Sequence, residues 1–241
     1  KVKNSRDKVK IALVGKYTAL HDAYISVNEA LKAAGWFYNK KVEINWVDSE
    51  TITRETAPEI LKDANGIIVP GGFGSRGIEG MLEAIRYARI NKVPYLGLCL
   101  GMQTAIIEFA RDVLNFPDAN SAEFNPGSMH PVIHLMPEQE KVTDLGATMR
   151  LGSYPCHLDP ASKTYQLYGQ ADISERHRHR YEVNNDYREQ LRTNGLVPLG
   201  FSPDNRIVEM VELRDHPFFI ATQAHPEFKS RPDHPHPLFK G

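Results

Sequence analysis

The chain has 241 residues, of which 41% are hydrophobic and 24% are charged, a composition typical of a globular protein with one large or two small cores. A formal net charge of −1 argues against general electrostatic attraction to nucleic acid or to a membrane, and two cysteines are too few for a disulfide framework. No apolar run approaches the length of a membrane span and no secretory leader begins at Lys1, so we expect a cytoplasmic chain with no nucleic-acid or membrane partner.

Strands and helices alternate in the first part of the chain. After a polar lead-in at residues 1–8, apolar runs and helical periodicity predict a strand at 9–14, a helix at 23–34 ended by Gly35, a strand at 42–47, a short helix at 58–64, a strand at 66–69, a helix at 77–91, a strand at 93–98 and a helix at 102–111. This alternation predicts βαβ units and a mostly parallel sheet flanked by helices. Such sheets place their ligands at the carboxyl ends of the strands.

The alternation stops after Arg111. Residues 114–158 are rich in Pro, Asn and Gly, which predicts loops and a small antiparallel piece with an extended stretch at 131–136. We then expect a polar strand at 178–183, a helix near 186–193, a hairpin of 196–202 with 206–213, and a buried strand at 218–224. No repeat or long linker is apparent, so we treat residues 9–241 as one domain.

A candidate nucleophile, Cys99, lies between a predicted buried strand and a predicted helix. Gly97 and Gly101 complete a G-x-C-x-G pattern, the cysteine form of the nucleophile elbow, in which glycines let neighbouring backbones approach. A thiol at this position faces the helix N-terminus, whose unpaired N–H groups favour the thiolate. Since a cysteine after an apolar strand is more often an inert core residue, this pattern needs a second observation.

That observation is a histidine after the last predicted strand. The apolar run FFIATQA ends in His225-Pro226-Glu227. The histidine can take the thiol proton, and a carboxylate two residues further on returns to the same side of an extended chain, where it can hold the other imidazole nitrogen. We therefore predict a triad of Cys99, His225 and Glu227.

Two glycine-containing segments suggest nucleotide binding but lack essential residues. Residues 72–77 fit G-x-G-x-x-G, yet no carboxylate lies about 20 residues further on. Gly15-Lys16 lacks both the first glycine and the following Ser or Thr of a phosphate loop. We expect neither segment to bind a nucleotide.

The segment RHRHRY at 176–181 could be a basic nucleic-acid patch, a metal site or one polar strand. It lacks interleaved aromatic residues for base stacking, and no further ligand supports a closed metal site, so we favour the strand and expect no metal. Strand alternation would then put His177, His179 and Tyr181 on the face opposite the arginines. The terminal HPHP at 234–237 is expected to be extended and solvated.

Three motifs resemble the signatures of class I, triad-type glutamine amidotransferases: PGGFG at 70–74, GLCLGMQ at 97–103 and AHPEF at 224–228. Their flanks resemble the amidotransferase domain of CTP synthases over nearly the whole chain, in VGKY at 14–17, DAYISVNEAL at 22–31, GGFGSRGIEGM at 71–81, DLGATMRLG at 144–152 and RHRHRYEVNN at 176–185. The resemblance implies an α/β fold of the class I glutamine amidotransferase, flavodoxin-like type.

The resemblance also implies which residues surround the substrate, beyond the triad. Backbone N–H groups would stabilise the oxyanion, and charged and amide side chains would hold a glutamine molecule by its amino and carboxylate ends. On its own, the glutamate at 123 would be interpreted as a solvated loop carboxylate. The residues implied are Gly71, Gly72, Leu100, Gln103, Glu123 and Arg180.

The implied reaction is hydrolysis of L-glutamine to glutamate and ammonia through a thioester. In CTP synthases this domain feeds ammonia to an N-terminal synthetase domain, which uses ATP and Mg²⁺ to aminate UTP with GTP as activator, in an enzyme that is a homo-oligomer (tetramer). No synthetase domain is recognisable here, so we expect residues 9–241 to be the amidotransferase domain alone, with no cofactor of its own. The resemblance places DLGATMRLG near the domain interface, with Arg150 as a contact.

Three alternatives stay open at this point. A cysteine hydrolase of the γ-glutamyl hydrolase type would share Cys99 and His225 but need not use Glu123 and Arg180 for a free amino acid. A different amidotransferase would share the triad and differ in its acceptor. A catalytically silent docking or regulatory domain would keep the fold without the chemistry.

Overall fold

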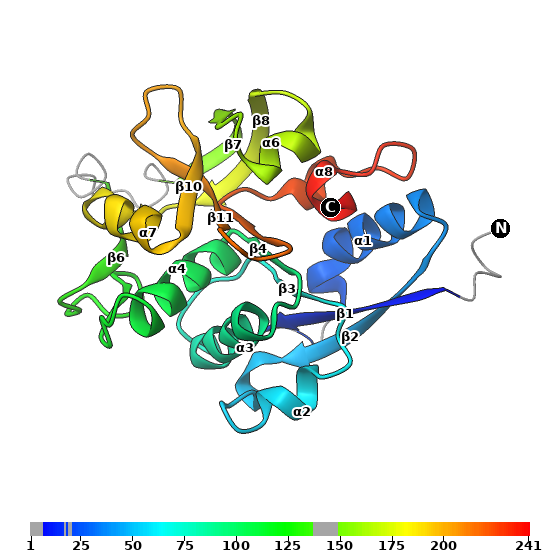
Figure 1. Ribbon diagram of the computed structural model, residues 1–241, viewed down its shortest axis with the longest axis horizontal. Coiled ribbons are helices and arrows are strands. Elements are labelled where there is room, and N and C mark those ends of the chain that lie inside the picture. The colour runs from blue at the N-terminus through cyan, green and yellow to red at the C-terminus, as the bar shows by residue number, and fades with distance from the viewer. Residues whose placement is uncertain (1–6, 17, 19–20, 137–148) are drawn as a thin grey trace.

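The computed structural model describes residues 7–16, 18, 21–136 and 149–241 (Figure 1). Its strands are β1 (Lys8–Gly15), β2 (Lys41–Asp48), β3 (Gly66–Val69), β4 (Tyr95–Leu98), β5 (Asn120–Ser121), β6 (Pro131–His134), β7 (Arg150–Leu158), β8 (Asp172–His179), β9 (Glu182–Val183), β10 (Leu196–Phe201), β11 (Val208–Leu213) and β12 (Phe219–Thr222). The α-helices are α1 (Ile25–Phe37), α2 (Ala57–Leu61), α3 (Ile78–Asn91), α4 (Leu100–Asp112), α6 (Lys163–Tyr168), α7 (Arg188–Asn194) and α8 (Pro237–Lys240). Short 3₁₀ turns lie at His21–Tyr24, Ser49–Thr51, Asn185–Tyr187 and Pro226–Lys229.

Nine strands form the central sheet in the order β2-β1-β3-β4-β12-β11-β10-β7-β8. The first five of these pair in parallel, and the remaining pairs from β12 to β8 are antiparallel. A separate sheet has the order β5-β6-β9, in which β6 and β9 run antiparallel. The predicted parallel sheet flanked by helices is confirmed.

The core lies on both faces of the sheet because side chains alternate along each strand. On β4, Tyr95 packs with the cluster that includes α3 and α4, whereas Leu96 packs with the cluster that includes α1 and α8. The hydroxyl of the fully buried Tyr95 donates to the carbonyl of Gly101 at 2.8 Å. This bond ties the strand before Cys99 to the helix after it.

Most predicted elements of the parallel half are present, but Gly35 does not end α1. The helix continues to Phe37, and Gly35 is buried inside it. A Cβ at Gly35 would lie 2.6 Å from Val42 Cγ2 and 2.9 Å from the Lys40 carbonyl. Glycine is present here because the helix and the next strand approach closely, a tertiary requirement that has the same local signature as a helix stop.

The largest difference from prediction is β7, a nine-residue strand in the region expected to form loops and a small antiparallel piece. β7 pairs antiparallel with β8 from Arg150–His179 to His157–Asp172. The predicted polar strand at 178–183 begins earlier, at Asp172, and is interrupted after His179. Each of these polar strands is stabilised by its partner rather than by a strong apolar pattern of its own, so local sequence gave little signal.

The C-terminal segment also differs from prediction at His236, which is buried rather than solvated. Its Nδ1 accepts from the Leu238 N–H at 3.2 Å, at the start of α8, and its Nε2 lies 2.7 Å from Glu175 Oε1. His234 is exposed, as expected. One histidine of the HPHP segment is therefore buried in contact with a carboxylate on β8.

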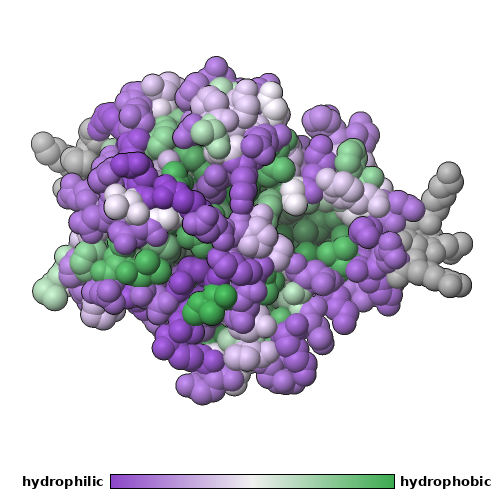
Figure 2. Space-filling model, viewed as in Figure 1, coloured by the Kyte–Doolittle hydropathy of each residue, from purple (hydrophilic) through white to green (hydrophobic). Residues whose placement is uncertain are grey.

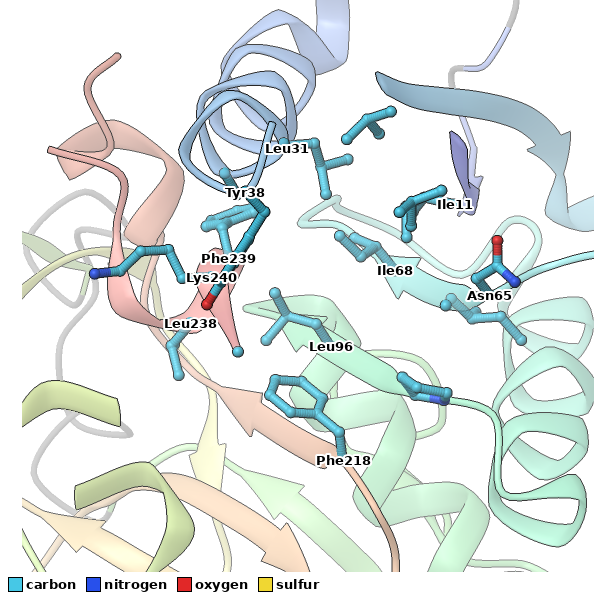
Figure 3. A pocket seen from close by; sticks show the side chains of 18 of the residues that line it. Ile11, Leu31, Tyr38, Asn65, Ile68, Leu96, Phe218, Leu238, Phe239 and Lys240 are labelled. Atoms are coloured by element: carbon cyan, nitrogen blue, oxygen red, sulfur yellow. The ribbon is translucent and has the colours of Figure 1, made fainter. Parts of the chain in front are cut away.

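A cavity of about 310 Å³ lies at the starts of β1, β3 and β4, the edge of the sheet opposite Cys99. Figure 2 shows it as a hydrophobic recess on a largely hydrophilic face, and Figure 3 shows side chains from the sheet, α1 and α8 around it. The walls are mainly hydrophobic and lack the triad. Residues lining it include Ile11, Leu31, Ile68, Leu96, Phe218 and Phe239.

Three predicted features lie partly outside the described residues. Residues 1–6 of the polar lead-in are outside, as are Tyr17 of VGKY and residues 144–148 of DLGATMRLG. Among the helices that the structure describes, none has both the length and the apolar composition needed to cross a bilayer.

Candidate active site

Cys99 occupies a sharp turn between β4 and α4. Its φ of 52° and ψ of −101° are rarely adopted by a residue with a side chain, and its N–H donates to the Thr222 carbonyl at 2.8 Å. Such strain at a strand-to-helix turn is characteristic of a nucleophile elbow. The structure therefore places Cys99 where the G-x-C-x-G pattern predicted it, at the carboxyl end of a parallel strand.

Glycines let β3, the glycine loop after it and His225 approach this turn closely. A Cβ at Gly101 would lie 2.2 Å from the Val69 carbonyl, so only glycine lets α4 start this close to β3. A Cβ at Gly71 would lie 2.7 Å from His225 Cε1 and 3.5 Å from Cys99 Cβ. The glycine loop after β3 is thus in direct contact with two candidate catalytic side chains.

His225 and Glu227 follow β12, the strand that pairs in parallel with β4. His225 Nδ1 lies 2.8 Å from Glu227 Oε1, which leaves Nε2 for Cys99. The Glu227 side chain is 6% exposed, and the His225 ring stacks on Phe228 with centroids 5.4 Å apart. The structure brings the three predicted triad residues together with the geometry expected of a nucleophile, a base and an orienting carboxylate.

The electrostatics of His225 favour its protonated form. Burial lowers the pKa of His225, but hydrogen bonds and Coulomb attraction from Cys99 and Glu227 outweigh burial and raise this pKa to about 10. An imidazolium at neutral pH is the partner that a thiolate needs.

The second cysteine has a different environment. Cys156 lies buried on β7 as a free thiol, and burial raises its pKa to about 12, helped by the nearby Glu209. A thiol of this kind is unreactive at neutral pH.

A polar cavity of about 80 Å³ opens beside Cys99. It is smaller than the 300 Å³ or more that drug-sized ligands typically occupy, so it suits a small polar molecule. Glu123 and Arg180 stand in its wall together, as predicted for the two charged ends of an amino acid. The lining residues are Gly72, Phe73, Cys99, Gln103, Glu123, Met149, His179, Arg180 and Tyr181.

Neighbouring groups offset only part of the effect of burial on the Glu123 carboxylate, whose pKa is raised. Burial raises the pKa of Glu123, and a hydrogen bond from the Gly74 N–H, together with Lys16 and Arg180, acts in the opposite direction. A cavity that presents both a carboxylate and a guanidinium can bind a zwitterion.

Lys16, rejected above as a phosphate-loop lysine, supports the glycine loop instead. It is 4% exposed, and its Nζ donates to the Phe73 carbonyl at 3.0 Å and to the Gly74 carbonyl. Burial lowers the pKa of Lys16 to about 8, although Glu123 acts against this shift. A lysine directly after the apolar run of β1 was the available sequence signal for this role.

A second hollow, of about 250 Å³, lies on the other side of Gly72 and Phe73 and reaches His225. Its walls include Tyr24 and Val27, from the start of α1, and Phe228. Cys99 lines both hollows.

Leu100 and Gln103 both lie in the first turn of α4. Leu100 is its first residue, so its N–H belongs to the turn that has no acceptor within the helix. Gln103 lines the polar cavity, and its Nε2 donates to the Tyr181 carbonyl at 3.1 Å and to Gln223 Oε1 at 3.2 Å. No sequence motif singled out Gln223, although it is the one amide in the apolar run FFIATQA that precedes His225.

The wall that carries Arg180 is supported by a buried ionic cluster. Arg150 Nη2 lies 2.6 Å from Glu209 Oε1, and Arg150 Nη1 lies 3.2 Å from Glu182 Oε1. Glu182 also lies 2.8 Å from His179 Nε2. Arg150, which was expected to contact another domain, is thus paired within this chain with one carboxylate from each of the two sheets.

His177 completes this cluster as a neutral ring. Burial lowers its pKa to about 2, and the neighbouring His179 and Arg150 act in the same direction. The predicted alternation is confirmed here, with His177 and His179 buried and Arg178 exposed. Across the described ranges, no group of three or more His, Cys, Asp or Glu side chains has the arrangement of a metal site.

A family model described as "Glutamine amidotransferase class-I" matches residues 19–241. The chain belongs to this family. The glutaminase domain of Trypanosoma brucei CTPS, solved with bound acivicin, superposes with a TM-score of 0.91 at 40% identity, covering 96% of this chain and 91% of that one. The predicted class I glutamine amidotransferase fold is therefore confirmed.

Curated relatives narrow the position within the family. The CTP synthase of Caldanaerobacter subterraneus is 60% identical over 240 residues, and that of Carboxydothermus hydrogenoformans is 60% identical over 238 residues. These matches cover 100% and 99% of this chain but 45% and 44% of the relatives. This amidotransferase chain groups with the glutaminase domain of CTP synthases and spans under half the length of those enzymes.

Proposed function

We propose that residues 9–241 form one glutaminase domain, which hydrolyses L-glutamine to glutamate and ammonia. The observation that carries the proposal is that Cys99 contacts the His225–Glu227 pair and also lines a cavity that presents Glu123 and Arg180. A nucleophile alone would suit many hydrolases. The paired charges of the cavity favour a free amino acid as the substrate.

The proposed reaction has two halves. In the first, the Cys99 thiolate attacks the carboxamide carbon, and its electron pair displaces the C=O π electrons onto oxygen. When the carbonyl re-forms, the C–N bond breaks, and the proton on His225 Nε2 goes to the departing nitrogen as ammonia leaves. The product at this stage is a thioester between Cys99 and the glutamyl carbonyl.

In the second half, neutral His225 takes a proton from water, and the resulting hydroxide attacks the thioester. The tetrahedral intermediate collapses with release of glutamate and the Cys99 thiolate, and His225 is again protonated. Glu227 holds Nδ1 throughout, which keeps Nε2 directed at the reacting atoms. Backbone N–H groups of Leu100 and of Gly71 or Gly72 would bind the oxyanion in both halves.

Substrate binding is assigned to the polar cavity. Glu123 would pair with the α-ammonium group of glutamine, and Arg180 with its α-carboxylate. Gln103 lines the same cavity. The small volume of the cavity disfavours polyglutamylated or peptide substrates.

The larger enzyme is part of the same proposal. The CTP synthase relatives support a ligase in which this domain supplies ammonia to a synthetase domain on the same chain, which aminates UTP to CTP. That domain, and not this one, would use ATP, Mg²⁺ and the activator GTP, and the full enzyme would be a cytoplasmic homotetramer. The domain assigned here needs no cofactor for glutamine hydrolysis.

The test is labelling of the purified chain with a glutamine-derived electrophile such as diazo-oxo-norleucine, followed by peptide mass spectrometry. We expect modification of Cys99, protection by free glutamine and no modification of Cys156. Cys99→Ala should lose both labelling and ammonia release, whereas Cys156→Ala should keep both.

Labelling of Cys99 that glutamine does not prevent would contradict a formed glutamine site. Protection by γ-glutamyl peptides but not by glutamine would favour the hydrolase alternative. A Cys99→Ala chain that still releases ammonia from glutamine would end the assignment of the nucleophile.

A further inference from the structure

Gln223 is a fully buried amide next to the candidate nucleophile. It follows β12 by one residue and is 0% exposed, and its backbone N–H donates to the Glu209 carbonyl at 2.9 Å. Its side-chain Nε2 lies 3.6 Å from Cys99 Sγ, within the range of a hydrogen bond to sulfur. No step of the reaction above uses this side chain.

The orientation of the Gln223 amide follows from a chain of contacts that starts at a backbone carbonyl. The Tyr181 carbonyl can only accept, so the Gln103 group 3.1 Å away must be its NH₂. The same NH₂ lies 3.2 Å from one end of the Gln223 amide, which must then be the oxygen. The other end, which faces Cys99, is therefore the NH₂ group of Gln223.

This polarity determines what Gln223 can offer to sulfur. An amide N–H is a donor that does not ionise at any pH the protein experiences, so Cys99 Sγ must accept from it. The Arg178 carbonyl, 3.9 Å from the same sulfur, accepts from a thiol but would repel a thiolate. Gln223 therefore favours the thiolate, whereas the Arg178 carbonyl disfavours it.

We propose that Gln223 is a thiolate-stabilising residue of this site, held in its donating orientation by Gln103 and the Tyr181 carbonyl. The inference rests on the proposed glutaminase function and deepens it. His225 gives up its proton when ammonia leaves and is neutral until it takes one from water. Gln223 donates throughout, so it stabilises the sulfur both as attacking group and as leaving group.

The amide chain also joins the nucleophile to the substrate wall. Tyr181 follows Arg180 in the turn between β8 and β9, so the carbonyl that orients Gln103 belongs to the segment that would bind the substrate carboxylate. A shift of that turn would disturb the donor at Cys99. Binding and nucleophile activation are thereby connected through two amides.

The test is the rate of Cys99 alkylation by iodoacetamide as a function of pH, with peptide mass spectrometry to separate Cys99 from Cys156. Gln223→Met replaces the amide by an apolar chain of similar length. We expect its alkylation at pH 7 to fall about tenfold, the effect of losing one hydrogen bond to a charged acceptor, while the limiting rate at high pH is retained. Gln223→Glu should fall further because a carboxylate then faces the sulfur.

Gln190→Glu on the exposed face of α7 is the matched control and should alkylate like the unmodified chain. Gln103→Met leaves Gln223 in place but frees its amide to turn, so we expect a smaller fall of about threefold. If Gln223→Met does not fold, as judged by circular dichroism, Gln103→Met decides the matter. Unchanged pH dependence in whichever of these variants is folded overturns the proposal.

Alkylation uses no glutamine, so the outcome is separable from the proposed function. A chain that fails to hydrolyse glutamine can still show the Gln223 effect. If the unmodified chain hydrolyses glutamine but Gln223→Met is alkylated at the normal rate, only the proposed role of Gln223 is contradicted. In the active chain, kcat should fall in Gln223→Met with KM little changed, because Gln223 does not line the polar cavity.

Discussion

The two halves of the central sheet contribute to the site in different ways. The parallel half, β2-β1-β3-β4-β12, supplies Cys99, the glycine loop and His225 from the carboxyl ends of neighbouring strands. The antiparallel half reaches the site through the end of β8, whose Arg178 carbonyl lies 3.9 Å from Cys99 Sγ and whose Arg176 carbonyl accepts from the His225 N–H at 2.7 Å. One half carries the reacting groups, and the other closes the cavity around them.

The chemical character of the two halves differs as well. The strands that carry Cys99 and His225 are buried on both faces, and short-range sequence patterns determine their turns. The wall that carries Arg180 is held by buried ion pairs of Arg150 with Glu182 and Glu209, which come from three different strands. If this division is correct, substitutions in the first half should change kcat and substitutions in the second half should change KM.

The largest effect is expected on the binding wall, from Arg180→Met. Removing a guanidinium that pairs with the substrate carboxylate should raise KM about a hundredfold, ~2.7 kcal/mol, with kcat within about threefold of the unmodified chain. Steady-state ammonia release is the measurement. Arg176→Met, exposed on β8, the strand that precedes Arg180, is the control and should leave KM unchanged. A fall in kcat with constant KM would contradict the division between the halves.

Glu227→Gln should act on the reacting half. Without the carboxylate, the pKa of His225 falls from its raised value and the imidazolium no longer supports the thiolate. We expect kcat to drop about thirtyfold, ~2 kcal/mol, a part of the effect typical of general acid–base catalysis, with KM little changed. Glu189→Gln, exposed on α7, controls for loss of charge. A rise in KM of similar size would place Glu227 in the binding wall instead.

The acid stability of the chain should report on the antiparallel half through His177. Its pKa is about 2 in the folded chain against an ordinary 6.5, so below pH 6.5 the unfolded chain takes up a proton that the folded chain does not. The free energy of unfolding should therefore fall as pH drops, by about 1.4 kcal/mol at pH 5.5 from this group. The loss is absent well above pH 6.5, where the ring is neutral in both states, and it grows as the pH falls from 6.5 toward the folded-state pKa.

His177→Phe should remove the part of the fall in the free energy of unfolding that comes from this ring. Urea denaturation of the variant and of the unmodified chain, each at pH 7.5 and pH 5.5, measures the difference. His157→Phe is the control, because that side chain is 56% exposed. Identical acid dependence in His177→Phe and the unmodified chain would show that the ring is not held neutral.

The smallest effect is expected from Lys16→Met, which removes the ammonium that holds the Phe73 and Gly74 carbonyls. The glycine loop lies between the two hollows, so its loosening should lower kcat/KM about fivefold, ~1 kcal/mol, the contribution of a typical hydrogen bond from a charged group. Lys32→Met on the exposed side of α1 is the comparison variant. Partial rescue by Lys16→Arg would distinguish support of the loop from simple packing, and no loss in Lys16→Met would remove the role.

Prediction from sequence succeeded where a residue's role depends on its near neighbours in the chain. β3 has the predicted bounds, and Cys99 lies at the predicted turn, because an apolar run followed by glycines specifies both the strand and its end. It failed where glycine or polarity served a distant contact. Gly35 was interpreted as a helix stop because its contact with Val42 forms only when α1 packs on the next strand. The length of β7 was not predicted because its partner, β8, is itself weakly patterned.

The amino-acid sequence alone thus determined the parallel α/β framework, the elbow cysteine and the histidine–carboxylate pair, because each follows from periodicity or from a motif of a few residues. Tertiary structure decided which polar groups meet these residues. The contact of Gln223 with Cys99, the support of the glycine loop by Lys16 and the burial of Arg150 between two carboxylates all join elements separated by tens of residues or more. Hydrogen bonds and ion pairs act over a few ångströms, so only the folded chain can select such partners.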